Sequence, residues 1–186
     1  MAFRGFIAVD LPSVAGVEAL LRELSETGAP LKLVRGELVH LTMKFLGDTQ
    51  EALVPRIVTA MHHAVEGISP FSVRIVGTGA FPSLRRMNVL WVGMEGGEPL
   101  RDIARRLEEG IEPLGFPREN REFSPHITVA RVKSGQGLDA VRKLLESRAK
   151  HSFGEVRVDS VRLKKSILTP QGPEYFTVEE VPLRPV

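Results

Sequence analysis

The sequence VHLTMKF at residues 39–45 and the sequence PHITVAR at residues 125–131 share one arrangement of side chains. Each places a histidine two residues before a threonine, and an apolar residue follows each of the two. The four residues are His40, Thr42, His126 and Thr128. In a β-strand the side chains at i and i+2 lie on one face, so each copy presents an imidazole and a hydroxyl together. The repeat predicts two related lobes that meet at a shared cleft.

The composition is that of a soluble globular protein. The chain has 186 residues, of which 42% are hydrophobic and 26% charged, and its formal net charge is +2. It contains no cysteine, which excludes disulfides, thiolate nucleophiles and cysteine-ligated metals. The N-terminal run MAFRGFIAVDLP lacks the features of a secretory signal, and no apolar run is long enough to span a bilayer. We expect one two-lobed domain over residues 1–186, in a cytoplasmic monomer with no membrane partner.

Hydrophobic periodicity predicts a mixture of strands and helices. Strands are expected at residues 6–9, 38–46, 71–77, 88–94, 125–132, 155–168 and 175–183. Helices are expected at residues 13–24, 53–65, 100–111 and 138–145. The Gly/Pro-containing run 77–86 is expected to be a loop. Strands follow one another as often as they alternate with helices, which favours an α+β fold with antiparallel sheets over a doubly wound parallel sheet.

Two histidines and two hydroxyls suit acid–base chemistry at a phosphate. An unperturbed imidazole titrates near neutral pH, so one histidine can accept a proton while the other donates one. The hydroxyls of Thr42 and Thr128 can donate hydrogen bonds to the non-bridging oxygens of a phosphate held between them. In-line displacement at phosphorus needs base and acid on opposite sides, which two facing lobes supply. This chemistry requires no metal.

Arg131 lies five residues after His126. In a regular strand its side chain points away from the histidine's face. It reaches the cleft only if the strand ends or bulges there. Its guanidinium would then suit a phosphate oxygen.

At this level of detail the sequence resembles a known family. The resemblance rests on FRGFIAVDLP, HLTMKFLGD, GTGAFPSLRRMNVLWVG, LGFPRENREFSPHITVARVK and LKKSILTPQGPEYFTVEEVPL, which together span nearly the whole chain. These segments are similar to the bacterial and archaeal RNA 2′,3′-cyclic phosphodiesterases, also called 2′-5′ RNA ligases, of the two-histidine phosphoesterase superfamily. One departure is visible, since the run VRGELVHLT lacks the Pro-Glu-Asn-Leu approach common in relatives.

The resemblance implies a bilobal α+β fold with two pseudo-symmetric lobes, each with an antiparallel sheet, outer helices and one motif in the central cleft. It implies that His40 is the proton donor, that His126 is the proton acceptor, and that Thr42, Thr128 and Arg131 hold the phosphate. The implied reaction opens a terminal 2′,3′-cyclic phosphate of RNA by expelling O3′ and leaves a 2′-phosphomonoester. The reverse reaction, with an RNA 5′-hydroxyl in place of water, forms a 2′-5′ linkage without ATP. No cofactor or metal is implied.

Three other functions remain open at this point. In the first, the enzyme acts on a small cyclic phosphate of a nucleotide or sugar. In the second, the protein is a non-catalytic nucleotide- or RNA-binding module. In the third, it is a zinc hydrolase, for which two histidines without a nearby carboxylate are a poor ligand set. Several further residues are candidates for RNA contacts, as basic pairs or as aromatic rings that stack on a base. They are Arg85, Arg86, Arg118, Arg121, Lys164, Lys165, Phe81 and Tyr175. We expect Trp91 to lie in the core, His62 and His63 to be exposed on a helix, and His151 to lie in a loop.

Overall fold

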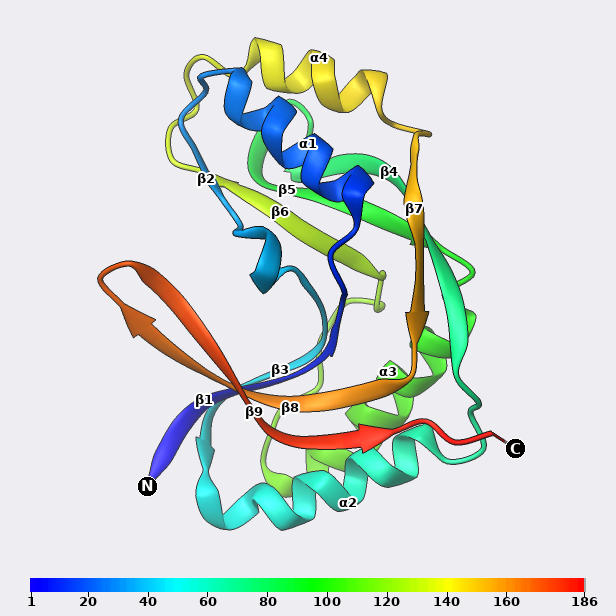
Figure 1. The fold of residues 1–186 in the computed structure, drawn as a ribbon. Helices are drawn as coiled ribbons and strands as arrows, with labels where there is room; N and C mark the ends of the chain where they lie inside the picture. The colour runs from blue at the N-terminus through cyan, green and yellow to red at the C-terminus, as the bar shows by residue number, and fades with distance from the viewer. Residues whose placement is uncertain (186) are drawn as a thin grey trace.

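The computed structural model describes residues 1–185 as two antiparallel sheets covered by helices (Figure 1). The four-stranded sheet has the order β3 (His40–Gln50), β1 (Ala2–Asp10), β8 (Ser160–Thr169) and β9 (Gly172–Pro182). The five-stranded sheet has the order β2 (Leu31–Leu33), β6 (His126–Val132), β5 (Arg86–Glu95), β4 (Phe71–Ser83) and β7 (Ser152–Val158). This arrangement confirms the expected α+β fold with two lobes.

Four helices form the outer layers of the two lobes. They are α1 (Ala15–Glu26), α2 (Val54–Val65), α3 (Glu98–Ile111) and α4 (Asp139–Ser147). Helices α2 and α3 pack together beside the four-stranded sheet, whereas α1 and α4 cover the five-stranded sheet (Figure 1). Each helix buries one stripe of apolar residues against its sheet, as the helical periodicity predicts. None of the helices within residues 1–185 is long and apolar enough to cross a membrane.

The lobes are interlaced in the sequence and are not its two successive halves. The chain enters the four-stranded sheet with β1, crosses to the five-stranded sheet with α1 and β2, and returns with β3. The prediction of a single strand at residues 155–168 is wrong, because these residues divide between β7 and β8. The two strands belong to different sheets. The burial pattern marks the division: Val156 and Val158 alternate, and Ser160 and Val161 are then buried in succession.

The expected loop at residues 77–86 is also wrong. Strand β4 continues to Ser83 and joins β5 through a short turn, so residues 77–83 belong to the sheet. Gly77 has a φ of +78°, which lets the strand shift register without breaking. At Gly79 an added Cβ would lie 2.2 Å from the Trp91 ring, so the missing side chain allows the indole to pack on the strand. Glycine here serves bends within a strand, which sequence alone does not distinguish from a turn.

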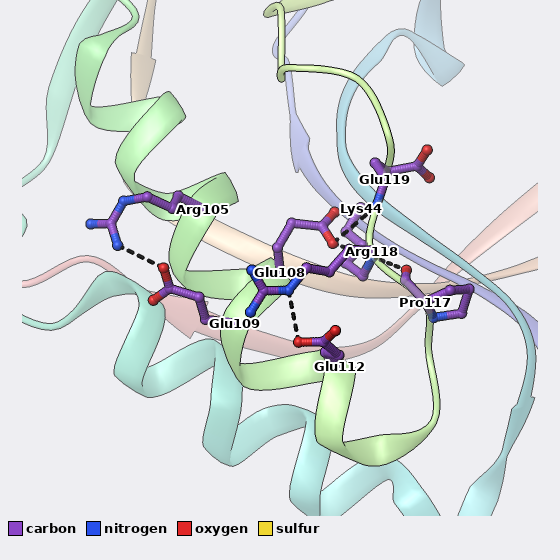
Figure 2. Close-up of polar contacts among 8 residues, drawn as sticks. All are labelled: Lys44, Arg105, Glu108, Glu109, Glu112, Pro117, Arg118 and Glu119. Atoms are coloured by element: carbon purple, nitrogen blue, oxygen red, sulfur yellow. Dashed lines mark hydrogen bonds and ion pairs between the residues drawn. The ribbon is translucent and has the colours of Figure 1, made fainter.

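A buried ion pair fastens the strand of the first motif to the segment that leads into the second. The side chain of Lys44 on β3 is 1% exposed and donates to Glu108 on α3 at 2.8 Å. Its Nζ also donates to the carbonyl oxygen of Pro117 at 3.0 Å, and Glu108 accepts from the backbone N–H of Glu119 (Figure 2). The loop before β6 is therefore tied to β3 by one buried cation and one carboxylate.

We expect Lys44→Met to lower the free energy of unfolding by about 3 kcal/mol or more, because it leaves the Glu108 carboxylate without its buried partner. Urea unfolding followed by circular dichroism measures this loss. The matched control is Arg105→Met on α3, since the exposed pair of Arg105 with Glu109 (Figure 2) should contribute less than about 1 kcal/mol. Equal losses in the two variants would contradict the structural role given to Lys44.

Candidate active site

The two motif strands line one cleft between the lobes. Strands β3 and β6 belong to different sheets but approach each other closely. The cleft has a volume of about 370 Å³. All five residues predicted from the sequence lie along it: His40, Thr42, His126, Thr128 and Arg131. The structure thus brings together side chains that are far apart in the sequence, as the repeated motif predicted.

The similarity between the two strands extends beyond the histidine and the threonine. In its pairing with β1, strand β3 skips Met43, and in its pairing with β5, strand β6 skips Val129. A bulge of this kind adds one residue to its strand, so the side chains that follow point to the opposite face from the one that regular alternation would give them. Phe45 in one lobe and Arg131 in the other, each five residues after its histidine, therefore return to the cleft side. The condition under which Arg131 reaches the cleft is met.

A backbone carbonyl fixes the orientation of each histidine ring. His40 Nδ1 donates to the carbonyl oxygen of Leu38 at 2.8 Å, and His126 Nδ1 donates to that of Ser124 at 2.7 Å. Because a carbonyl oxygen only accepts, both Nδ1 atoms carry hydrogen and each Nε2 is left for proton transfer. His40 Nε2 lies 3.1 Å from Thr42 Oγ1. The run before the first motif differs from that of relatives, but it still supplies the Leu38 carbonyl that holds His40. Leu38 ends the 3-10 helix Gly36–Leu38.

Charged groups behind His40 act on its protonation. Burial lowers the pKa of His40 from its ordinary value of 6.5, the Leu38 carbonyl and the Asp10 carboxylate oppose this effect, and the ammonium of Lys164 adds to it. Asp10 accepts from Lys164 at 2.7 Å and from Arg162 at 2.7 Å. Burial alone would raise the pKa of Asp10, but these two donors hold it below its ordinary range. His40 therefore faces a carboxylate that remains ionised.

Aromatic rings pack against each histidine in a similar way in the two lobes. The ring of His40 lies 5.2 Å from the rings of Phe6 and Tyr175. The ring of His126 lies 5.0 Å from that of Phe81 and 6.4 Å from that of Trp91. The imidazoles are thus held from the side as well as through Nδ1, which limits their rotation. Trp91, expected in the core, is partly buried and packs against the rings of Phe81 and His126.

The cleft lining is basic. Three cations, Arg4, Lys32 and Arg131, lie along it, and no acidic residue does. Among residues 1–185, none of these three forms an ion pair with a carboxylate. Lys32 is paired directly opposite Arg131 in the β2–β6 ladder. Like charges in that position are unfavourable unless an anion lies between them.

Arg4, Lys32 and Phe45 also line the cleft, although the sequence pattern did not predict them there. Phe45 sits in Leu38–Leu46, the apolar stretch expected to carry the first motif, but only the bulge at Met43 turns it outward. Lys32 belongs to a strand of three residues, too short to show a period. The one available signal was the repeat itself, because Phe45 occupies the position in the first motif that Arg131 occupies in the second.

Most of the other candidates lie elsewhere. His62 and His63 are exposed on α2, and His151 lies in a loop before β7, as expected. Arg118 pairs with Glu112 at 2.7 Å, and Lys164 is buried against Asp10, so these basic residues do not line the cleft. Tyr175 does line it. Within residues 1–185, no group of three or more histidine, cysteine or acidic side chains is arranged to hold a metal ion.

The chain is similar to a defined set of known proteins. A family model described as the 2'-5' RNA ligase superfamily matches residues 14–166. The chain is 36% identical over 181 residues to the RNA 2',3'-cyclic phosphodiesterase of Methanothermobacter thermautotrophicus, covering 96% of this chain and 98% of that protein. It is 40% identical over 170 residues to the protein of the same name from Aeropyrum pernix, covering 90% of this chain and 96% of that protein.

Solved structures agree with the fold. The crystal structure of TT0787 of Thermus thermophilus superimposes with a TM-score of 0.78 at 32% identity, over 97% of this chain and 98% of that one. Escherichia coli LigT complexed with 3'-AMP superimposes with a TM-score of 0.79 at 21% identity, over 98% of this chain and 99% of that one, and this likeness concerns the fold alone. By the family model and by its relatives over nearly its full length, the chain belongs to the 2'-5' RNA ligase superfamily.

Proposed function

We propose that this protein is an RNA 2′,3′-cyclic phosphodiesterase that hydrolyses a terminal cyclic phosphate to a 2′-phosphomonoester. One observation carries the proposal: two histidines, one from each lobe, line a single basic cleft, and a backbone carbonyl holds each ring with Nε2 available. The curated relatives, which bear the name of this activity and match the chain over nearly their whole length, support it.

The two histidines divide the proton transfers of the reaction. His126 Nε2 accepts a proton from the attacking water, and His40 Nε2–H donates a proton to the departing O3′. The low pKa of free His40 makes its imidazolium a stronger acid. Binding of the anionic phosphate beside it favours the protonated form. When an RNA 5′-hydroxyl replaces water as the nucleophile, His126 accepts the proton of that hydroxyl, His40 again donates to the departing O3′, and the product is a 2′-5′ linkage.

The threonines and the arginine stabilise the charge on phosphorus. The hydroxyls of Thr42 and Thr128 donate to the two non-bridging oxygens, each from the same strand face as its histidine. Arg131 adds a cation on the lobe of His126. The two strands that carry these donors are held in place before the reaction by their buried neighbours. A metal ion has no assigned role in these steps.

We also propose the oligomeric state, the compartment and the substrate of the enzyme. A single chain supplies both motifs to the cleft, so a monomer is sufficient for catalysis. The absence of cysteine fits a reducing compartment, and we assign the enzyme to the cytoplasm on that basis. The substrate is an RNA, or an RNA fragment such as a piece of tRNA, that ends in a 2′,3′-cyclic phosphate.

Product analysis on a short RNA with a 2′,3′-cyclic phosphate end tests this function. In the presence of EDTA we expect the wild-type protein to yield a 2′-phosphate. We expect His40→Ala and His126→Ala each to lower kcat by roughly 10²–10⁴, the usual contribution of one acid or base. His62→Ala is the matched control, since His62 is exposed on α2 and should leave the rate unchanged. Loss of activity in EDTA would contradict a metal-free mechanism, and RNA bound but uncleaved by the wild type would favour a binding module.

The charges behind His40 predict the outcome of a second experiment. Because the Asp10 carboxylate raises the pKa of His40, Asp10→Asn removes this effect and leaves only the Leu38 carbonyl to oppose burial and the Lys164 ammonium, which lower the pKa. We expect the pKa of His40 to fall further in this variant, so a smaller fraction of the general acid is protonated at neutral pH. NMR titration of the His40 ring protons measures the change. Asp48→Asn, an exposed neutralisation further along β3, is the control and should not move the His40 titration.

A further inference from the structure

Lys32 is an exposed lysine at the rim of the catalytic cleft. It lies on β2, the edge strand of the five-stranded sheet, and lines the cleft together with Val34 on the same strand face. Its partner in the β2–β6 ladder is Arg131, so two positive charges lie directly opposite each other. Among residues 1–185, neither side chain forms an ion pair with a carboxylate. Because this arrangement is destabilising without a bound anion, it indicates a role in binding one.

Arg131 acts across the cleft toward the opposite lobe. Burial raises the pKa of the Tyr175 phenol on β9, and the charges of Arg131 and Arg4 oppose this rise. Since Arg131 belongs to the five-stranded sheet and Tyr175 to the four-stranded sheet, the guanidinium lies close enough to the other lobe to affect its titration. It is therefore placed beside a phosphate held between the two histidines. Lys32 lies one strand further out, at the edge of the sheet (Figure 1).

The spacing along β6 fits the phosphate that precedes the reacting one in an RNA strand. Thr128, which we propose donates to the reacting phosphate, is separated from Arg131 by three residues of strand, roughly 10 Å at about 3.3 Å per residue, and the bulge at Val129 shortens this distance. Neighbouring phosphates of an RNA strand are separated by a single ribose. The long side chain of Lys32, opposite Arg131, covers the remaining span.

The number of charges separates an RNA end from a small cyclic nucleotide. A nucleoside 2′,3′-cyclic phosphate brings one anion, which Arg131 accompanies, and it leaves Lys32 without a partner. An RNA end brings a second anion, the phosphodiester on the 5′ side of its terminal nucleoside. An ammonium group is a compact charge with three donors, which suits an oxygen of this phosphodiester. Within residues 1–185, no acidic side chain lines the cleft to compete for it.

We infer that Lys32 binds the phosphodiester immediately 5′ of the nucleoside that carries the cyclic phosphate. The inference rests on the proposed function and deepens it, because it makes Lys32 the residue that favours RNA ends over mononucleotides. Lys32 touches no reacting atom, so its contribution lies in substrate binding. Since a phosphodiester carries no sequence information, the preference is the same for every base at the terminal position.

Three substrates test this assignment. They are adenosine 2′,3′-cyclic phosphate, the dinucleotide ApA with a 2′,3′-cyclic phosphate end, and the same dinucleotide with an uncharged methylphosphonate linkage. We expect the wild-type kcat/KM for the charged dinucleotide to exceed that for the uncharged one by roughly 5- to 20-fold, as one charged hydrogen bond at a partly exposed site contributes. Lys32→Met should reduce this ratio to nearly one, mainly through KM. Lys32→Arg should retain it.

Lys143→Met is the matched control, since it removes the same charge from the same lobe. Lys143 is exposed on α4, outside the cleft lining, and its loss should not change the ratio. A wild-type ratio near one, or a high ratio that persists in Lys32→Met, would overturn the assignment. A defect of Lys32→Met confined to ligation would move the subsite to the strand that supplies the 5′-hydroxyl, and so would also overturn it. If the wild type hydrolyses none of the three compounds and no longer RNA with a cyclic phosphate end, the proposed function itself is rejected.

Discussion

Each motif strand has to bury one row of side chains and present the other to the cleft, and the active site depends on this constraint. In β3 the residues Leu41 and Met43 pack into the core while His40 and Thr42 face outward. The bulge at Met43 then changes which residues face outward. Strand β6 solves the same problem with a bulge at its own equivalent position. Both lobes therefore present three cleft residues within a short segment, at fixed spacing and on a rigid element.

The same strands combine mechanical stability with catalytic geometry. Lys44, buried between the sheet and α3, holds the loop that leads to the second motif. The imidazoles are fixed by backbone carbonyls and by the packing of aromatic rings. Within the described residues 1–185, backbone carbonyls and no side-chain carboxylate accept from the Nδ1 atoms and orient the rings. This differs from a catalytic triad, in which an acidic residue performs that task.

The charge distribution explains how a protein of small net charge can bind a polyanion. The chain carries a formal charge of only +2, yet the cleft contains three cations and no acidic residue. The acidic residues are used elsewhere, for example Glu108 with Lys44 and Glu112 with Arg118. In two of the basic pairs noted in the sequence, one member is held by a carboxylate. Glu112 holds Arg118 of the pair Arg118–Arg121, and Asp10 holds Lys164 of the pair Lys164–Lys165. Ion pairing in the fold, and not the local density of lysine and arginine, decides which cations are free for phosphate.

The α+β class, the four helices and the four residues of the two histidine–threonine pairs could be predicted from the amino-acid sequence, because strand alternation and helical periodicity are local properties. Three other features could be seen only in the folded protein. These are the division of residues 155–168 between two sheets, the extension of β4 through its glycines, and the outward turn of Phe45 and Arg131. Each depends on the register between strands distant in the sequence, and register is set by pairing partners and bulges that no single segment encodes.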